Sequence, residues 1–220
     1  MKRFLLAFLV VAVSVLLVSC KNAVNLEMYL SEIRSVVYTY SGDNYSLSVY
    51  GEEKESPYIS DGFVGQLKTY VTVKIENYKT PLDNASVTVN FNEKSVSGKF
   101  DYSPLSGKFI AEIETDGLPT DSEIGLIIAS GGNEETFTLS KFSKEGQIDY
   151  KTALNSVSYE KNDEIKKMLN GNGDSIEVRV RVLTEGESVY YYVAVIGKDE
   201  KSLTCLVDGA SGKILAERKT

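Results

Sequence analysis

The acidic side chains at positions 52 to 61 have the types and spacing best suited to chemistry. Glu52, Glu53, Glu55 and Asp61 lie close together around a Pro-Tyr pair and an Asp-Gly pair. Two carboxyl groups held roughly 5–10 Å apart across a glycosidic bond can hydrolyse it, one as the acid and the other as base or nucleophile. Acids clustered between two strands more often form a solvated loop. We therefore expect a polar loop here, with a weak cation or partner site as the alternative.

The absence of histidine narrows the possible enzyme classes. None of the 220 residues is His, which excludes Ser-His-Asp and Cys-His nucleophiles, histidine proton shuttles and zinc sites that use imidazole. An enzyme would have to work with carboxylates or tyrosine alone. We therefore expect a protein that is not an enzyme and that uses no cofactor and no metal.

Three other spacings begin a motif without completing it. Asn170–Asp174 places side-chain oxygens at alternate positions, as calcium loops do, but Arg181 stands where the acidic twelfth ligand belongs. Ala210–Lys213 resembles the end of a phosphate-binding loop, yet the first glycine and the final Ser or Thr are missing. Tyr70 and Lys74 suit a catalytic pair only on a helix, whereas the alternation around them predicts a strand. No catalytic or metal site follows from these spacings.

Three consecutive tyrosines provide the candidate interaction residues. Tyr190, Tyr191 and Tyr192 stand in an apolar segment, and a strand places successive side chains on opposite faces. Tyrosine is favoured on recognition surfaces and also in half-buried strands. Packing and partner binding therefore both stay open, with Tyr190 and Tyr192, which share a face, as the candidates for binding.

The first twenty residues are typical of a secretory signal. Lys2 and Arg3 precede an apolar stretch of about 15 residues, shorter than the ~20 that a membrane-spanning helix needs. The sequence Leu17-Val18-Ser19-Cys20 resembles the lipobox of bacterial lipoproteins, in which the chain is cut before the cysteine and the sulfur is acylated. The resemblance implies a signal peptide at 1–19, a lipid anchor on Cys20 and an extracytoplasmic place on the bacterial cell membrane. A simple signal peptide or membrane anchor with an incidental cysteine is the alternative.

Charge and cysteine content limit the possible partners. Removal of residues 1–19 would leave 22 basic residues against 31 acidic ones, a formal charge of −9. An acidic chain is not drawn to nucleic acid by electrostatics. Cys205 would be the one thiol free for disulfide chemistry, and its apolar neighbours predict a small buried side chain. A redox function that needs a cysteine pair is excluded.

Alternating apolar residues predict a run of strands over residues 35–142, after an anchor-proximal lead-in at 20–34. The alternation is strict in Leu67–Ile75 and in Ala85–Phe91. About eight short strands separated by turn signals are typical of a β-sandwich of immunoglobulin-like architecture. The buried tryptophan and cysteine pair of true immunoglobulin domains are missing, so the likeness concerns architecture alone.

The periodicity changes after a polar linker at 143–147. Residues 148–220 begin with helical spacing at Ala153–Val157, and Asn162 can cap a second helix. Three strands follow, of which Val189–Ile196 is apolar on both faces and should be central. A helical segment followed by an antiparallel meander is an α+β unit, and we expect it to fold independently.

This last unit resembles the PepSY module in three segments: Tyr192–Val195, Leu206–Asp208 and Gly212–Leu215. The resemblance implies a small helix-plus-antiparallel-sheet domain without catalytic residues, of a kind found in bacterial envelope proteins and peptidase propeptides. We therefore expect a non-catalytic, lipid-anchored extracytoplasmic protein that binds or regulates, with an envelope protein or a peptidase as partner. A peptidase inhibitor and a structural or solute-binding accessory lipoprotein are the alternatives.

Overall fold

The computed structural model describes residues 23–59, 63–78, 82, 84–171, 175–197 and 201–220. The expected signal peptide, Cys20 and Asp61 lie outside these residues, as do positions 172–174 of the calcium-like loop. Among the helices that are described, none is both long and apolar enough to cross a membrane.

The fold is mainly β and is built on one large sheet whose strand pairs are antiparallel with a single exception, β1 with β10. Each segment in which alternation was expected forms a strand: Leu67–Ile75 lies within β3, and β4 covers most of Ala85–Phe91. The strands are β1 (Leu30–Ser41), β2 (Tyr45–Glu55), β3 (Leu67–Tyr78), β4 (Ser86–Phe91), β5 (Lys94–Lys99), β6 (Asp101–Ser103), β7 (Lys108–Thr115), β8 (Glu123–Ser130), β9 (Asn133–Lys141), β10 (Ile176–Glu185), β11 (Ser188–Gly197), β12 (Ser202–Asp208) and β13 (Ile214–Lys219).

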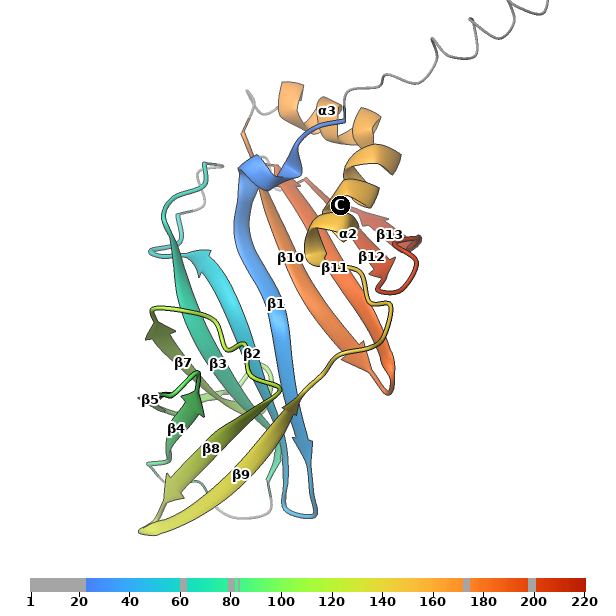
Figure 1. The fold of residues 1–220 in the computed structure, drawn as a ribbon. Coiled ribbons are helices and arrows are strands. Elements are labelled where there is room, and N and C mark those ends of the chain that lie inside the picture. Colours follow the sequence, from blue (N-terminus) through green and yellow to red (C-terminus); the bar gives the residue numbers. More distant parts are fainter. Residues whose placement is uncertain (1–22, 60–62, 79–81, 83, 172–174, 198–200) are drawn as a thin grey trace, which may run out of the picture.

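The first part of the chain forms a sandwich-like body from β1 to β9. Its strands are neighbours in the order β6-β7-β3-β2-β1-β9-β8-β4-β5, and this path folds over so that two layers face each other (Figure 1). Apolar side chains from both layers fill the space between them, as alternation predicts. We call this the sandwich core; it includes Tyr38, Leu47, Val49, Val71, Val73, Ile75, Val87, Val89, Ile124, Leu126 and Leu139.

The second part places two helices on one face of β10–β13 (Figure 1). These helices are α2 (Tyr150–Glu160) and α3 (Asn162–Gly171). The expected helical face of Ala153–Val157 is buried against the strands. The resulting helix-covered core contains Leu26, Leu30, Ile33, Val37, Ala153, Leu154, Val157, Ile165, Val178, Val180, Val193, Val195, Leu203, Cys205 and Val207.

The two helices begin in different ways, and only the start of α3 departs from the expectation. Asp149 caps α2, accepting a hydrogen bond from the Thr152 backbone N–H at 2.7 Å. Asn162, expected to cap the second helix, is itself the first residue of α3, and neither of its buried amide atoms has a hydrogen-bond partner. The reason is that α3 follows α2 after Lys161 alone, whose backbone N–H still bonds to the Val157 carbonyl. No extended residue intervenes to act as a cap.

Strand β1 belongs to both parts of the molecule. Leu30–Arg34 pairs in parallel with β10, while Tyr38 and Thr39 pair with β9 on the same edge. A register irregularity against β2 lies between Arg34 and Val36. Beyond Arg34 the hairpin of β10 and β11 swings away from β1 (Figure 1). The short 3₁₀ helix η1 (Leu26–Tyr29) precedes β1, so the lead-in expected at 20–34 carries part of the helix-covered core.

Two expectations about the second part, a central β11 and a buried Cys205, are confirmed, and the Asp208–Gly212 turn is well defined. Strand β11, which contains Val189–Ile196, lies between β10 and β12. Asp208 accepts hydrogen bonds from the backbone N–H groups of Ala210 and Ser211 at 3.2 and 2.7 Å, and Gly212 has a φ of +74°, which glycine adopts without strain. Cys205 is 1% exposed.

Candidate functional site

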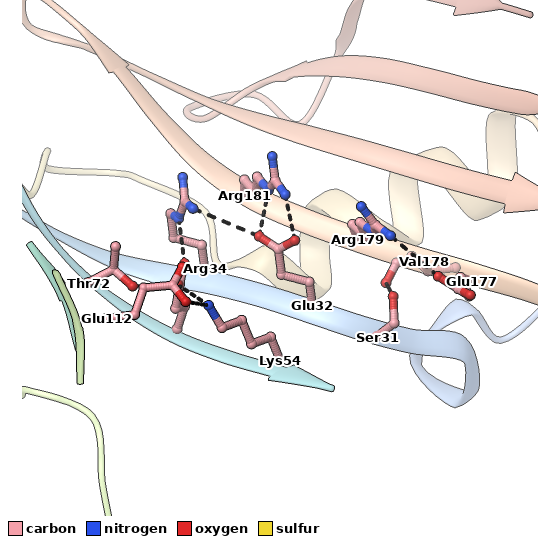
Figure 2. A network of polar contacts seen from close by, with 11 residues as sticks. Ser31, Glu32, Arg34, Lys54, Thr72, Glu112, Glu177, Val178, Arg179 and Arg181 are labelled. Carbon is pink, nitrogen blue, oxygen red and sulfur yellow. Dashed lines mark hydrogen bonds and ion pairs between the residues drawn. The ribbon is translucent and has the colours of Figure 1, made fainter. Parts of the chain in front are cut away.

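A chain of charged side chains crosses the junction between β10, β1 and β2, on the sheet face away from the helices. Arg181 of β10 donates two hydrogen bonds to Glu32 of β1, at 2.5 and 2.6 Å. Arg34 of β1 donates from Nε to Glu52 of β2 at 2.9 Å. Figure 2 shows these guanidinium groups lying in a row along the two strands. Since bidentate arginine–carboxylate pairs are geometrically specific, this cluster fixes how the two parts of the molecule join.

Glu52 is the most deeply buried carboxylate of this junction cluster. Glu52 is 2% exposed, and the Thr72 hydroxyl donates a hydrogen bond to its Oε1 at 2.6 Å. Burial opposes ionisation, but the charge of Arg34, the Thr72 hydrogen bond and the charge of Lys54 outweigh it and hold the pKa of Glu52 below its ordinary value. Glu52 is therefore an ionised, paired carboxylate and is not a proton donor near neutral pH.

The expectation of a solvated acidic loop at this place is wrong. Glu52, Glu53 and Glu55 belong to strand β2, and Glu52 and Glu55 are buried. The strand continues because β1 pairs with it as far as Lys54 and β3 as far as Glu55. These strands provide Arg34 and Thr72 as partners for Glu52. A sequence signal was present, since positions 48, 50, 52 and 54 continue the polar alternation of a strand.

Tyr58 extends the cluster along β10. Its hydroxyl donates to Glu177 at 3.1 Å, and the guanidinium of Arg179 lies 5.0 Å from the centre of its ring. Arg179 also approaches Glu177 at 3.6 Å. Each carboxylate of Glu32, Glu52 and Glu177 thus has a cationic partner, and within the described part of the chain no group of three candidate ligands could hold a metal ion. The arrangement is suited to holding strands together rather than to acid–base chemistry.

The three candidate tyrosines lie in different surroundings. Tyr191 is buried; its hydroxyl donates to the Ile148 carbonyl at 2.7 Å and accepts from Gln147, so it packs the linker onto β11. Tyr190 and Tyr192 are half-buried on the opposite face, where Tyr192 pairs across the strands with Arg181 and Leu206. Tyr190 lines a groove on that face.

A groove of about 610 Å³ lies on the face away from the helices, between β2 and β3 on one side and β10–β13 on the other. The β10–β13 side carries the apolar surface of the groove, formed by Leu183, Tyr190, Leu206 and Leu215, and also includes Thr184 and Glu185. Leu183 and Leu215 are 39% and 50% exposed. The opposite side is more polar and includes Tyr50, and Arg34 lies at the place where β1 leaves β10. We call this the β10 groove. It has the size of a small-ligand or peptide site.

Comparison with known proteins places the chain in no group: no family model matches it, and neither does any curated protein.

Proposed function

We propose that the mature chain begins at Cys20, carries a lipid anchor there and acts outside the cytoplasm of a bacterium as a non-catalytic binding or regulatory protein. The basic start, the apolar stretch and the Leu-Val-Ser-Cys sequence support the anchor. Acyl chains at ~0.8 kcal/mol per buried methylene hold such a protein on a membrane.

We propose further that the sandwich-like part is immunoglobulin-like in architecture and that residues 148–220 form a PepSY-like module. The two facing layers around the sandwich core support the first assignment. Support for the second comes from the two helices that cover a four-stranded meander and from the Asp208–Gly212 turn. A fold of either kind assigns no activity, so the function rests on the site.

The observation that carries a binding function is the β10 groove with its exposed apolar side. Leu183 and Leu215 are at least a third exposed on one concave surface, beside Tyr190. Exposed apolar surface costs solubility, and when gathered in a groove it marks a binding site. The carboxylates of Glu32, Glu52 and Glu76 beside the groove are each paired with a cation, which argues against a catalytic use of the same surface.

Replacing Tyr190 tests the binding function. Tyr190→Ser should weaken partner recovery from solubilised membranes by more than ~1 kcal/mol, as truncation of interface aromatics does, and should leave the melting temperature nearly unchanged. The matched control is Tyr159→Ser, which changes a 69% exposed tyrosine on α2. Equal recovery by the parent, Tyr190→Ser and Tyr159→Ser would show that the groove binds no partner.

The anchor has a separate test. Membrane-extracted protein should have the mass of a chain that begins at an acylated Cys20, and Cys20→Ser should release the protein from membranes. An unmodified chain that retains Met1, or a cut at another residue, would contradict the lipoprotein assignment.

A further inference from the structure

An edge of β10, in addition to its face, lines the groove. Four consecutive residues, Val182–Glu185, contribute to the lining. Successive side chains of a strand point to opposite faces, so four in a row line one groove only when the strand presents its edge. On this side β10 pairs with β1 as far as Arg181, opposite Arg34, and no described strand continues the pairing.

The chemistry of such an edge specifies an extended polypeptide. Backbone N–H and C=O groups of Val182–Glu185 that point away from β11 have no strand beside them. An unpaired edge is a template for an added strand, which supplies main-chain hydrogen bonds while neighbouring pockets select side chains. Leu183, Tyr190, Leu206 and Leu215 provide the apolar surface for such side chains.

Arg34 lines the groove where this edge begins, and a second cation, Lys74, contacts the ring of the lining residue Tyr50. The Arg34 guanidinium and the Lys74 ammonium both lie over the ring of Tyr50, at 4.5 and 5.0 Å from its centre. Lys74 is half-buried, and within the described part of the chain it forms no ion pair. Burial and then the charge of Arg34 lower the pKa of Lys74. The surrounding charges do not balance: five cations (Arg34, Lys54, Lys74, Lys108 and Arg181) face four carboxylates (Glu32, Glu52, Glu76 and Glu112).

We propose that the β10 groove binds the C-terminal end of an extended polypeptide, which adds to β10 as an antiparallel strand and places its terminal carboxylate against Lys74 and Arg34. The direction follows from the position of the cations. Strand β10 runs from Arg181 to Glu185 away from Arg34, so only a chain of opposite direction ends at Arg34. The carboxylate would provide the missing negative charge.

This inference rests on the proposed binding function and specifies its partner class. Thr220 of the same molecule is not the occupant, because its backbone N–H and carbonyl pair with Ser202. We take the partner to be a separate chain with an accessible C-terminus and apolar residues near its end.

Two peptide libraries, one with free C-termini and one with free N-termini, test the direction in which the bound chain runs. The mature protein in detergent is presented with random heptapeptides displayed with free C-termini and with the same library displayed with free N-termini. Enrichment in the first library alone is the expected result. Enrichment in the second library, or in neither, overturns the inference, whereas the proposed binding function is judged by the Tyr190→Ser recovery experiment and can survive that result.

The best enriched peptide then tests the carboxylate and the edge separately. C-terminal amidation should weaken its binding about tenfold or more, since charge-assisted hydrogen bonds are lost. Lys74→Met should weaken binding of the free-acid peptide to a similar extent and leave binding of the amidated peptide unaffected. The matched control Lys94→Met, on β5, should change the affinity for neither peptide. Methylation of alternate peptide nitrogens should abolish binding, because those N–H groups would pair with β10.

Two outcomes of these measurements contradict the proposal. Equal affinity of acid and amide would remove the role of the cations. A concentration-dependent dimer of the protein that excludes the peptide, seen in sedimentation, would identify a second copy of this chain as the occupant of the edge.

Discussion

The two cores of this protein are assembled from the sequence in different ways. The sandwich core draws its buried residues from one stretch, Tyr38 to Leu139. The helix-covered core takes Leu26–Val37 from before that stretch and Ala153–Val207 from after it. The polar segment at 143–147 thus marks the point where the chain passes from the sandwich core to the helix-covered core, while strand β1 contributes to both cores. A boundary that is visible in sequence composition therefore need not be a place where the molecule can be divided.

The largest expected effect is the loss of folding when the helix-covered part is produced without β1. A chain of residues 146–220 should fail to fold, because it lacks Leu26, Leu30, Ile33 and the β1 neighbour of β10. Circular dichroism and amide NMR dispersion measure this. Residues 23–41 joined to 143–220 by a flexible linker should regain structure. A cooperative unfolding transition for 146–220 alone would show that the second part is independent after all.

Glu52→Gln tests how strongly the junction cluster holds the two parts together. The change leaves the half-buried Arg34 with only its longer contact to Glu32, at 3.9 Å. Breaking a buried pair in this way costs about 3 kcal/mol in the free energy of unfolding, measured with urea. The control Glu112→Gln alters a 53% exposed partner of Lys54 and should cost less than ~1 kcal/mol. Equal losses for the two variants would mean that the cluster does not depend on burial.

The same glutamate predicts a pH dependence with a definite sign. Since the pKa of Glu52 is lowered in the folded state, its stabilising contribution is complete above the unfolded value near 4.5 and is lost as pH falls through the lower folded pKa. Glu52→Gln should therefore approach the parent in stability at low pH. A constant difference between them from pH 7 downward would contradict this.

A matched pair of buried hydroxyls tests whether the two cores unfold together. Cys205→Ser places a hydroxyl in the helix-covered core, and Ala111→Ser does the same in the sandwich core; both parent residues are 1% exposed. Each should cost about 2 kcal/mol. If β1 couples the cores, both variants shift one common urea transition. Two transitions, each moved by only one of the variants, would show that the cores unfold separately. Burial raises the pKa of the Cys205 thiol to about 11, so slow alkylation of the folded parent provides a further check.

Lys74→Met should have the smallest effect and the opposite sign. The folded state lowers the pKa of Lys74, so its charge opposes folding at neutral pH, and methionine should leave stability unchanged or slightly raised in calorimetry. The advantage of the variant should shrink as pH rises through the folded pKa towards 10.5, where the parent loses the charge. A clear loss of stability at pH 7 would show that Lys74 has a favourable structural role.

Local pattern was enough to predict most elements of this fold, but it could not predict how distant segments pair. The alternation in Leu67–Ile75 and Ala85–Phe91 identified β3 and β4, and the helical spacing at Ala153–Val157 identified α2. The continuation of β2 through Glu55 was missed because its stabilising partners, Arg34 and Thr72, are about 20 residues away on other strands.

The candidate site depended even more on long-range pairing. Tyr190 was identified from its residue type, and the groove that it lines exists because β1 leaves β10 after Arg34. Neither the parallel pairing of β1 with β10 nor the irregularity between Arg34 and Val36 has a signal in the residues themselves. Arg181 and Glu32, which meet across 149 positions, could be recognised as a pair only in the structure.

The shared strand also has a mechanical consequence. If Cys20 is tethered to a membrane and a ligand occupies the β10 groove, a pull on the ligand passes through β10 to β1 and then to the tether. The hydrogen bonds between these strands lie across the direction of that pull, so they are loaded together in shear rather than opened one after another. The bidentate Arg181–Glu32 pair bridges the same two strands. The joint that aligns the two parts of the molecule would thus also be the element that bears tension.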